Sequence, residues 1–165
     1  MKEITIEQAE EKAKEWQSQG KKWHFHMLTP DCVFNENKEK HAFVLENRTD
    51  DETFVVYSEK RYMDLGQKLV KLVHGDKILE KDKQESIAPS NKVNNMIRKA
   101  KELNEKGILW HHHMLFPNCI FNKHSGKWVI VFEDKESGET IEAIYDTEPV
   151  NDLREIEVLY YAQKE

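Results

Sequence analysis

Residues 23–35 have the sequence W-H-F-H-M-L-T-P-D-C-V-F-N, and residues 110–122 have the sequence W-H-H-H-M-L-F-P-N-C-I-F-N. Both stretches fit the pattern W-H-x-H-M-L-x-P-x-C-x-F-N and lie 87 positions apart. At the same offset, 14 of the 24 residues from position 12 to position 35 are identical between the two halves. A match at a fixed offset is the sequence signature of an internal repeat. We therefore interpret the chain as a tandem duplication.

The match weakens outside this segment. At the same offset the matching residues include Val44, Glu46, Glu52 and Thr53, which correspond to Val131, Glu133, Glu139 and Thr140. With one added residue in the second half, Tyr57, Asp64 and Leu65 match Tyr145, Asp152 and Leu153. The copies have diverged nearly everywhere except in the histidine-cysteine segment, so folding or function has held that segment in place.

Each copy is predicted to begin with a helix. In the first copy, Thr5 and Gln8 form a capping box ahead of Ile6, Ala9, Ala13 and Trp16 at helical spacing. In the second copy, Val93, Met96, Ile97, Ala100 and Leu103 repeat that spacing. Gly20 and Gly107 supply left-handed stops.

Three strands and a second helix are predicted to follow. The Trp-His-x-His-Met-Leu segment is the first strand, and residues 29–32 and 116–119 form proline turns after it. Further strands are expected near residues 41–46 and 53–58, and near 127–133 and 140–145. The closing helices are expected to begin at Asp64 and Asp152, with capping boxes completed by Gln67 and Glu155.

The predicted fold class is α+β, with the order α-β-β-β-α occurring twice. Each repeat is expected to hold an antiparallel three-stranded sheet with helices. The predicted boundaries are residues 1–75 for the first repeat, 76–90 for a charged linker and 91–165 for the second repeat. Units of about 70 residues are marginal alone, because small domains bury a smaller share of their surface. We therefore expect the repeats to be related by a pseudo-twofold axis.

Composition and charge limit which partners and which cellular location are expected. The chain of 165 residues has a net charge of −6, which argues against a nucleic-acid or anionic-membrane partner. No apolar run approaches the roughly 20 residues of a membrane helix, and the start lacks a secretion signal. A cytoplasmic location is therefore expected. In a reducing compartment Cys32 and Cys119 are expected to be thiols or metal ligands.

The repeated segment carries the candidate metal ligands. Side chains alternate along a strand, so His24 and His26 are expected on one face of it and His111 and His113 on one face of theirs. His112 corresponds to Phe25 and points the other way, so we discount it as a ligand. Imidazole and thiolate are usual zinc ligands. The candidate metal residues are His24, His26, Cys32, His111, His113 and Cys119.

The position of the cysteine limits this hypothesis. A straight strand would place Cys32 about 20 Å from His26, so the chain must fold back for the two to meet. Three such ligands would leave a fourth position for water, a carboxylate or the other half of the chain. The sequence has no C-x-x-C or H-E-x-x-H motif, and no acidic residue is assigned as a matched ligand. The cofactor is therefore undecided, with zinc as the candidate.

A purely structural interpretation explains the same residues. Strand histidines beside tryptophan can be partly buried residues with satisfied rings, and a cysteine after a turn is commonly a small core residue. On this interpretation the protein is a non-catalytic binding or regulatory module, which is the leading expectation. A protein partner or self-association stays open. A Cys-His nucleophile pair lacks a local signature, so catalytic residues and enzyme status are undecided.

Nucleic-acid binding is a third hypothesis. The order α-β-β-β-α resembles the double-stranded-RNA-binding fold, and the resemblance covers element order alone. That fold uses a basic start to its last helix to reach phosphates. Here the closing helices begin with the acidic residues Asp64 and Asp152, and fold order by itself does not define function.

Overall fold

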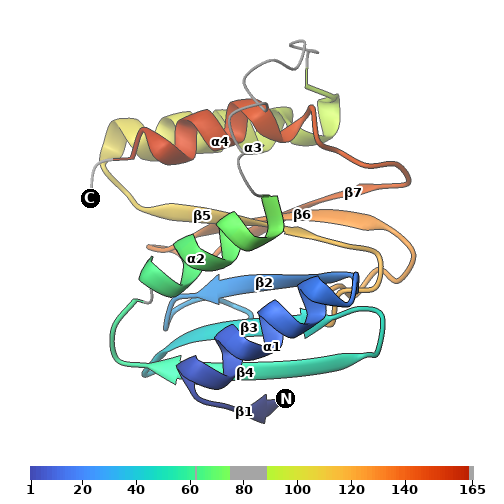
Figure 1. Ribbon diagram of the computed structural model, residues 1–165. Helices are drawn as coiled ribbons and strands as arrows, with labels where there is room; N and C mark the ends of the chain where they lie inside the picture. The colour runs from blue at the N-terminus through green and yellow to red at the C-terminus, as the bar shows by residue number, and fades with distance from the viewer. Residues whose placement is uncertain (62, 75–88, 164–165) are drawn as a thin grey trace. The chain divides into compact units, whose positions relative to one another are not determined.

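The computed structural model describes residues 1–61, 63–74 and 89–163, and Figure 1 shows their elements. The chain divides into two compact units, Met1–Gln84 and Glu85–Glu165. Gly75, the predicted end of the first repeat, and residues 76–88 of the predicted linker lie outside the described residues. The predicted boundaries therefore stay predictions.

The first unit contains a four-stranded mixed sheet and two helices (Figure 1). Its elements are β1 (Lys2–Glu3), α1 (Ile6–Ser18), β2 (Trp23–Leu28), β3 (His41–Asn47), β4 (Glu52–Ser58) and α2 (Met63–His74). The strand order is β1-β4-β3-β2, with β1 parallel to β4 and the other pairs antiparallel. The sequence did not predict β1, because two polar residues carry no strand pattern of their own. Its pairing depends on β4, and the backbone N–H of Ile4 continues it by donating to Val55 O at 2.9 Å.

The second unit contains a three-stranded antiparallel sheet, as the sequence predicts. Its elements are α3 (Asn91–Lys106), β5 (Trp110–Leu115), β6 (Trp128–Asp134), β7 (Thr140–Tyr145) and α4 (Leu153–Tyr161), with the strand order β5-β6-β7. The α+β class is confirmed. The pseudo-twofold relation between repeats stays a prediction.

The helix ends follow local chemistry in the first half of each unit. Thr5 and Gln8 form the predicted capping box, with N···O distances of 3.2 and 2.9 Å. Gly20 and Gly107 adopt left-handed backbone angles, with φ of +67° and +71°, where a β-carbon would be strained. These residues explain why α1 and α3 end ahead of the histidine strands.

The closing helices do not have the predicted capping boxes. Helix α2 begins at Met63, so Asp64 lies within its first turn. Asp152 makes no side-chain cap hydrogen bond to α4, and its carboxylate instead accepts from the backbone N–H of Ser90 at 3.0 Å. Glu155 pairs with Lys101 on α3 at 3.2 Å. The Asp152 and Glu155 side chains, which the sequence assigned to capping of α4, therefore interact with residues of α3 and of its N-terminal end instead.

The helices of each unit cover one face of its sheet (Figure 1). The buried residues of this core are Ala9, Ala13, Trp16, Trp23, Phe43, Leu45, Val56, Leu65 and Leu69 in the first unit. They are Val93, Met96, Ile97, Ala100, Leu103, Trp110, Ile130, Phe132, Ala143, Tyr145, Leu153 and Ile156 in the second. The Trp23 and Trp110 indole N–H groups donate to Gln17 and Asn104, both at 2.9 Å. Both tryptophans therefore pack their strands against the helices.

Candidate metal centres

The paired histidines project from the sheet face opposite the helices. Trp23 lies in the helix-facing core, and alternation along β2 directs His24 and His26 to the other face. Their ring centroids are 4.9 Å apart with planes at 83°. His111 and His113 on β5 also have centroids 4.9 Å apart, with planes at 75°. The prediction that each pair shares one face is confirmed.

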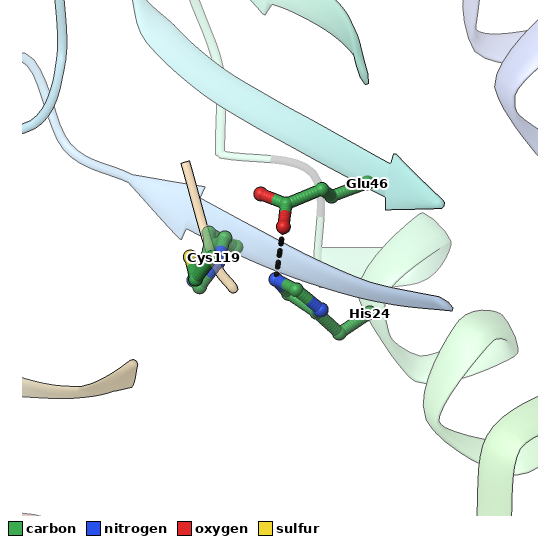
Figure 2. A group of neighbouring side chains, drawn as sticks. His24, Glu46 and Cys119 are labelled. Atoms are coloured by element: carbon green, nitrogen blue, oxygen red, sulfur yellow. Dashed lines mark ion pairs between the residues drawn. The ribbon is translucent and has the colours of Figure 1, made fainter. Parts of the chain in front are cut away.

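A glutamate lies directly across the sheet from the first histidine of each pair. In the antiparallel register, His24 on β2 faces Glu46 on β3. Their Nε2 and Oε2 atoms are 3.3 Å apart, as the dashed line in Figure 2 marks. On β5 and β6, His111 faces Glu133 with the corresponding atoms 2.6 Å apart. Each sheet therefore brings two imidazoles and a carboxylate together.

One group of histidine and glutamate side chains in each unit could hold a metal ion. We call the group of His24, His26 and Glu46 the first site. The second site comprises His111, His113 and Glu133. Within each site one ligand atom from every residue lies within 4.8 Å of the others. A tetrahedral ion with bonds of about 2.0–2.3 Å separates its ligands by about 3.3–3.8 Å, so small side-chain movements would close either site around an ion.

Within each unit the predicted histidines lie together, and a glutamate that the sequence did not assign joins them. The loops that hold Cys32 and Cys119 follow the ends of β2 and β5, and both cysteines are buried thiols. The assignment of all six predicted residues as metal ligands stays a prediction.

The sequence did not identify the two glutamates as candidate ligands. Glu46 and Glu133 occupy equivalent positions at the offset of 87 that defines the repeat. The signal was therefore present, but it required the strand register to show that this position faces His24 rather than solvent. Both carboxylates are only 3% exposed, which is rare for glutamate unless it is paired or coordinates a metal.

Burial keeps one imidazole of the first site neutral. His26 is 8% exposed, and desolvation, followed by the neighbouring His24, lowers its pKa to about 3, against the opposing effect of Glu46. A neutral imidazole retains the nitrogen lone pair that binds a metal, whereas a protonated ring has none to offer. His26 is therefore in its ligand form at neutral pH.

The proline loop fixes each cysteine in the same way. The Cys32 N–H donates to Thr29 O and the Asn35 N–H donates to Cys32 O, both at 3.0 Å, which gives two successive turns. The Asn35 side-chain amide donates to Thr29 O at 2.9 Å and to Lys40 O at 2.7 Å.

In the second unit Asn122 repeats these contacts, at 2.8 Å to Phe116 O and 2.7 Å to Lys127 O. The backbone turns at Cys119 also have the same 3.0 Å hydrogen bonds. The shared P-x-C-x-F-N sequence thus encodes one loop geometry, which confirms the predicted turns and accounts for the matched proline and asparagine.

His112 takes no part in either site. Its ring lies on the helix-facing side of β5, 6.1 Å from the Trp110 ring and 5.5 Å from the Tyr160 ring between centroids. Desolvation, followed by the proximity of His111, lowers its pKa to about 4. The expectation that His112 points away from the other two histidines is confirmed.

No family model, curated protein or solved structure matches this chain. Among the described residues, none of the helices combines the length and the apolar character that crossing a bilayer requires. The two sites are therefore the features from which a function can be argued.

Proposed function

We propose that this protein binds divalent metal ions of the zinc type, with two sites per chain. The observation that carries the proposal is the pair of sites, each with two imidazoles and one carboxylate whose ligand atoms lie within 4.8 Å of one another. Two such groups built on equivalent strand positions are harder to explain by chance core packing than one.

The donor atoms favour a borderline transition metal. Zinc commonly takes histidine nitrogen, cysteine sulfur and carboxylate oxygen in a tetrahedral site. Calcium and magnesium prefer six or more oxygen ligands, which these groups do not offer. Copper(II) binds nitrogen and sulfur sites more tightly than zinc in the usual affinity order, so metal identity depends on supply and geometry. Zinc is the ion that the mixed nitrogen and oxygen donors fit best.

The role we propose for the metal is structural rather than catalytic. Each site supplies three protein ligands, and the burial of its carboxylate favours a structural role. Both glutamates are 3% exposed, so the proposed ion would lie in a region that excludes solvent. This proposal agrees with the sequence-based expectation of a non-catalytic module.

Elemental analysis tests the proposal. The untagged full-length protein is stripped with a chelator, reloaded with zinc, passed through a desalting column and measured by plasma mass spectrometry. We expect two zinc ions per chain. His26→Ala and His113→Ala should each leave one, because each removes an imidazole from a different site.

His124→Ala is the matched control. His124 lies outside both sites and pairs with Glu142 at 3.1 Å, so its removal should leave two zinc ions bound. A zinc content below roughly 0.2 ions per chain in the reloaded wild-type protein would overturn the proposal, since a folded structural site normally binds zinc tightly.

A further inference from the structure

The backbone groups of Trp110 point toward the edge of the second unit's sheet. Trp110 begins β5, which is an edge strand of that sheet. Asp134 lies opposite it on β6, and the Asp134 N–H donates to Glu139 O at 2.9 Å, on the side away from β5. Facing residues of an antiparallel pair either exchange both hydrogen bonds or point away from each other. The N–H and C=O of Trp110 therefore point away from β6.

The side-chain amide of Gln163 binds both of these backbone groups. The Trp110 N–H donates to Gln163 Oε1 at 2.9 Å, and Gln163 Nε2 donates to Trp110 O at 3.1 Å. A primary amide offers one acceptor and two donors, so it pairs with Trp110 as a peptide unit of a neighbouring strand would. Gln163 Nε2 also donates to Tyr160 O on α4 at 3.2 Å. Gln163 thereby links the end of α4 to the start of β5.

This link lies one residue from a candidate metal ligand. His111 follows Trp110 on β5, and its Nε2 atom is 2.6 Å from Glu133 Oε2 on β6. The Trp110 side chain is itself fixed, because it is 1% exposed and its indole N–H donates to Asn104 at 2.9 Å. With its backbone also held by Gln163, Trp110 gives His111 a fixed starting point on the strand.

The sequence restricts this link to the second copy. Trp23 is the equivalent of Trp110, and its indole N–H has the equivalent partner, Gln17, at 2.9 Å. With the one added residue in the second half, Gln163 corresponds to Gly75. Glycine has no side-chain amide with which to bind a strand edge, so the copies differ in this support.

We propose that Gln163 is a positioning residue for the second metal site. By holding Trp110 it fixes the backbone of His111, which orients the imidazole toward the ion. This inference rests on the proposed function. Removing a group that directly orients a metal ligand typically lowers metal affinity by about 10–100-fold. Gln163 acts through a neighbouring residue, so we expect the low end of that range, about tenfold.

Zinc titration against a chelating indicator, in full-length variants with one site each, tests the proposal. The variant His24→Ala/His26→Ala keeps only the second site, and the variant His111→Ala/His113→Ala keeps only the first. Adding Gln163→Ala to the variant that keeps the second site should raise its zinc Kd by about tenfold. The same change should leave the zinc Kd of the variant that keeps the first site unaltered.

Tyr145→Phe is the matched control for a loss of stability. It removes a core hydroxyl that lies 3.2 Å from Ser90 Oγ in the second unit, and it leaves the contacts of Trp110 in place. The visible spectrum of bound cobalt(II) reports the geometry of its ligands. In the variant that keeps the second site, Gln163→Ala should alter this spectrum, whereas Tyr145→Phe should alter neither the spectrum nor the zinc Kd.

Three outcomes would contradict the proposal. An unchanged zinc Kd for Gln163→Ala at the second site, or an equal rise for Tyr145→Phe, would overturn the positioning role and leave metal binding intact. A similar rise at the first site would show a general effect on the chain and would also overturn that role. Absence of zinc binding in both single-site parents would overturn the proposed function itself.

Discussion

Replacing His112 by phenylalanine should remove a pH-dependent loss of stability from the metal-free protein. His112 lies among the aromatic rings of the second core, and burial lowers its pKa to about 4 from the ordinary 6.5. Phe25 occupies the equivalent position in the first copy and stacks on Phe43 at 5.2 Å. A phenyl ring therefore suits this environment and does not titrate.

The sign and size follow from proton linkage. Above pH 6.5 the ring is neutral in both the folded and the unfolded state, so pH has no effect through this group. Between pH 6.5 and pH 4 the unfolded chain takes up a proton that the folded chain refuses, so the free energy of unfolding falls as pH falls. A difference of about 2.5 pH units gives a full loss on the order of 3 kcal/mol, most of which is reached by pH 4.5.

The assay is urea unfolding followed by tryptophan fluorescence at pH 7.5 and pH 4.5, with a chelator present throughout. Wild-type protein and His112→Phe are compared at both values, so that other titrating groups cancel in the double difference. The wild-type protein should lose roughly 2–3 kcal/mol more than the variant. Equal losses would show that His112 is not held neutral in the folded state and would refute the burial argument.

Two further stability predictions concern local structure. Asn35→Ala should lower the free energy of unfolding by roughly 2–3 kcal/mol in urea titrations, because two backbone carbonyls lose their donor. Asn122→Ala should have an equal effect in the second unit. An effect below about 0.5 kcal/mol would show that these side-chain hydrogen bonds do not stabilise the loops. Thr5→Ala should cost about 1 kcal/mol by removing the capping box of α1, whereas Thr5→Ser should restore the stability; equal stability of the alanine and serine variants would argue against capping.

Local signals in the sequence were enough to place most of the elements. The capping box at Thr5, the left-handed glycines and the period-two alternation around His24 depend on residues near one another in the chain. Such features form whatever the distant partners are, so they can be derived from one stretch of sequence. The repeat added a second instance of the left-handed glycine and of the histidine alternation, which supported the prediction of β2 and β5.

The errors came from long-range pairing. Strand β1 exists only because its two residues pair with Phe54 and Val55 on β4. Asp152 was expected to cap its own helix, but Ser90, 62 positions away, donates to its carboxylate. Glu46 can be identified as a candidate ligand only from the β2–β3 register, which places it opposite His24. In each case the deciding neighbour lies elsewhere in the sequence, and its position is known only once the chain is folded.

The asparagine-closed loop also suggests a place for protein engineering. One amide side chain fixes the loop by donating to two main-chain carbonyls, and the residues between these contacts differ in the two copies: residues 36–39 are Glu-Asn-Lys-Glu in one copy and residues 123–126 are Lys-His-Ser-Gly in the other. Glu36 and Glu39 are exposed, whereas the Lys38 side chain donates to Cys32 O at 2.8 Å. A fluorophore or a short epitope attached at the two exposed positions would report on the neighbouring cysteine without altering the strands that present the histidines.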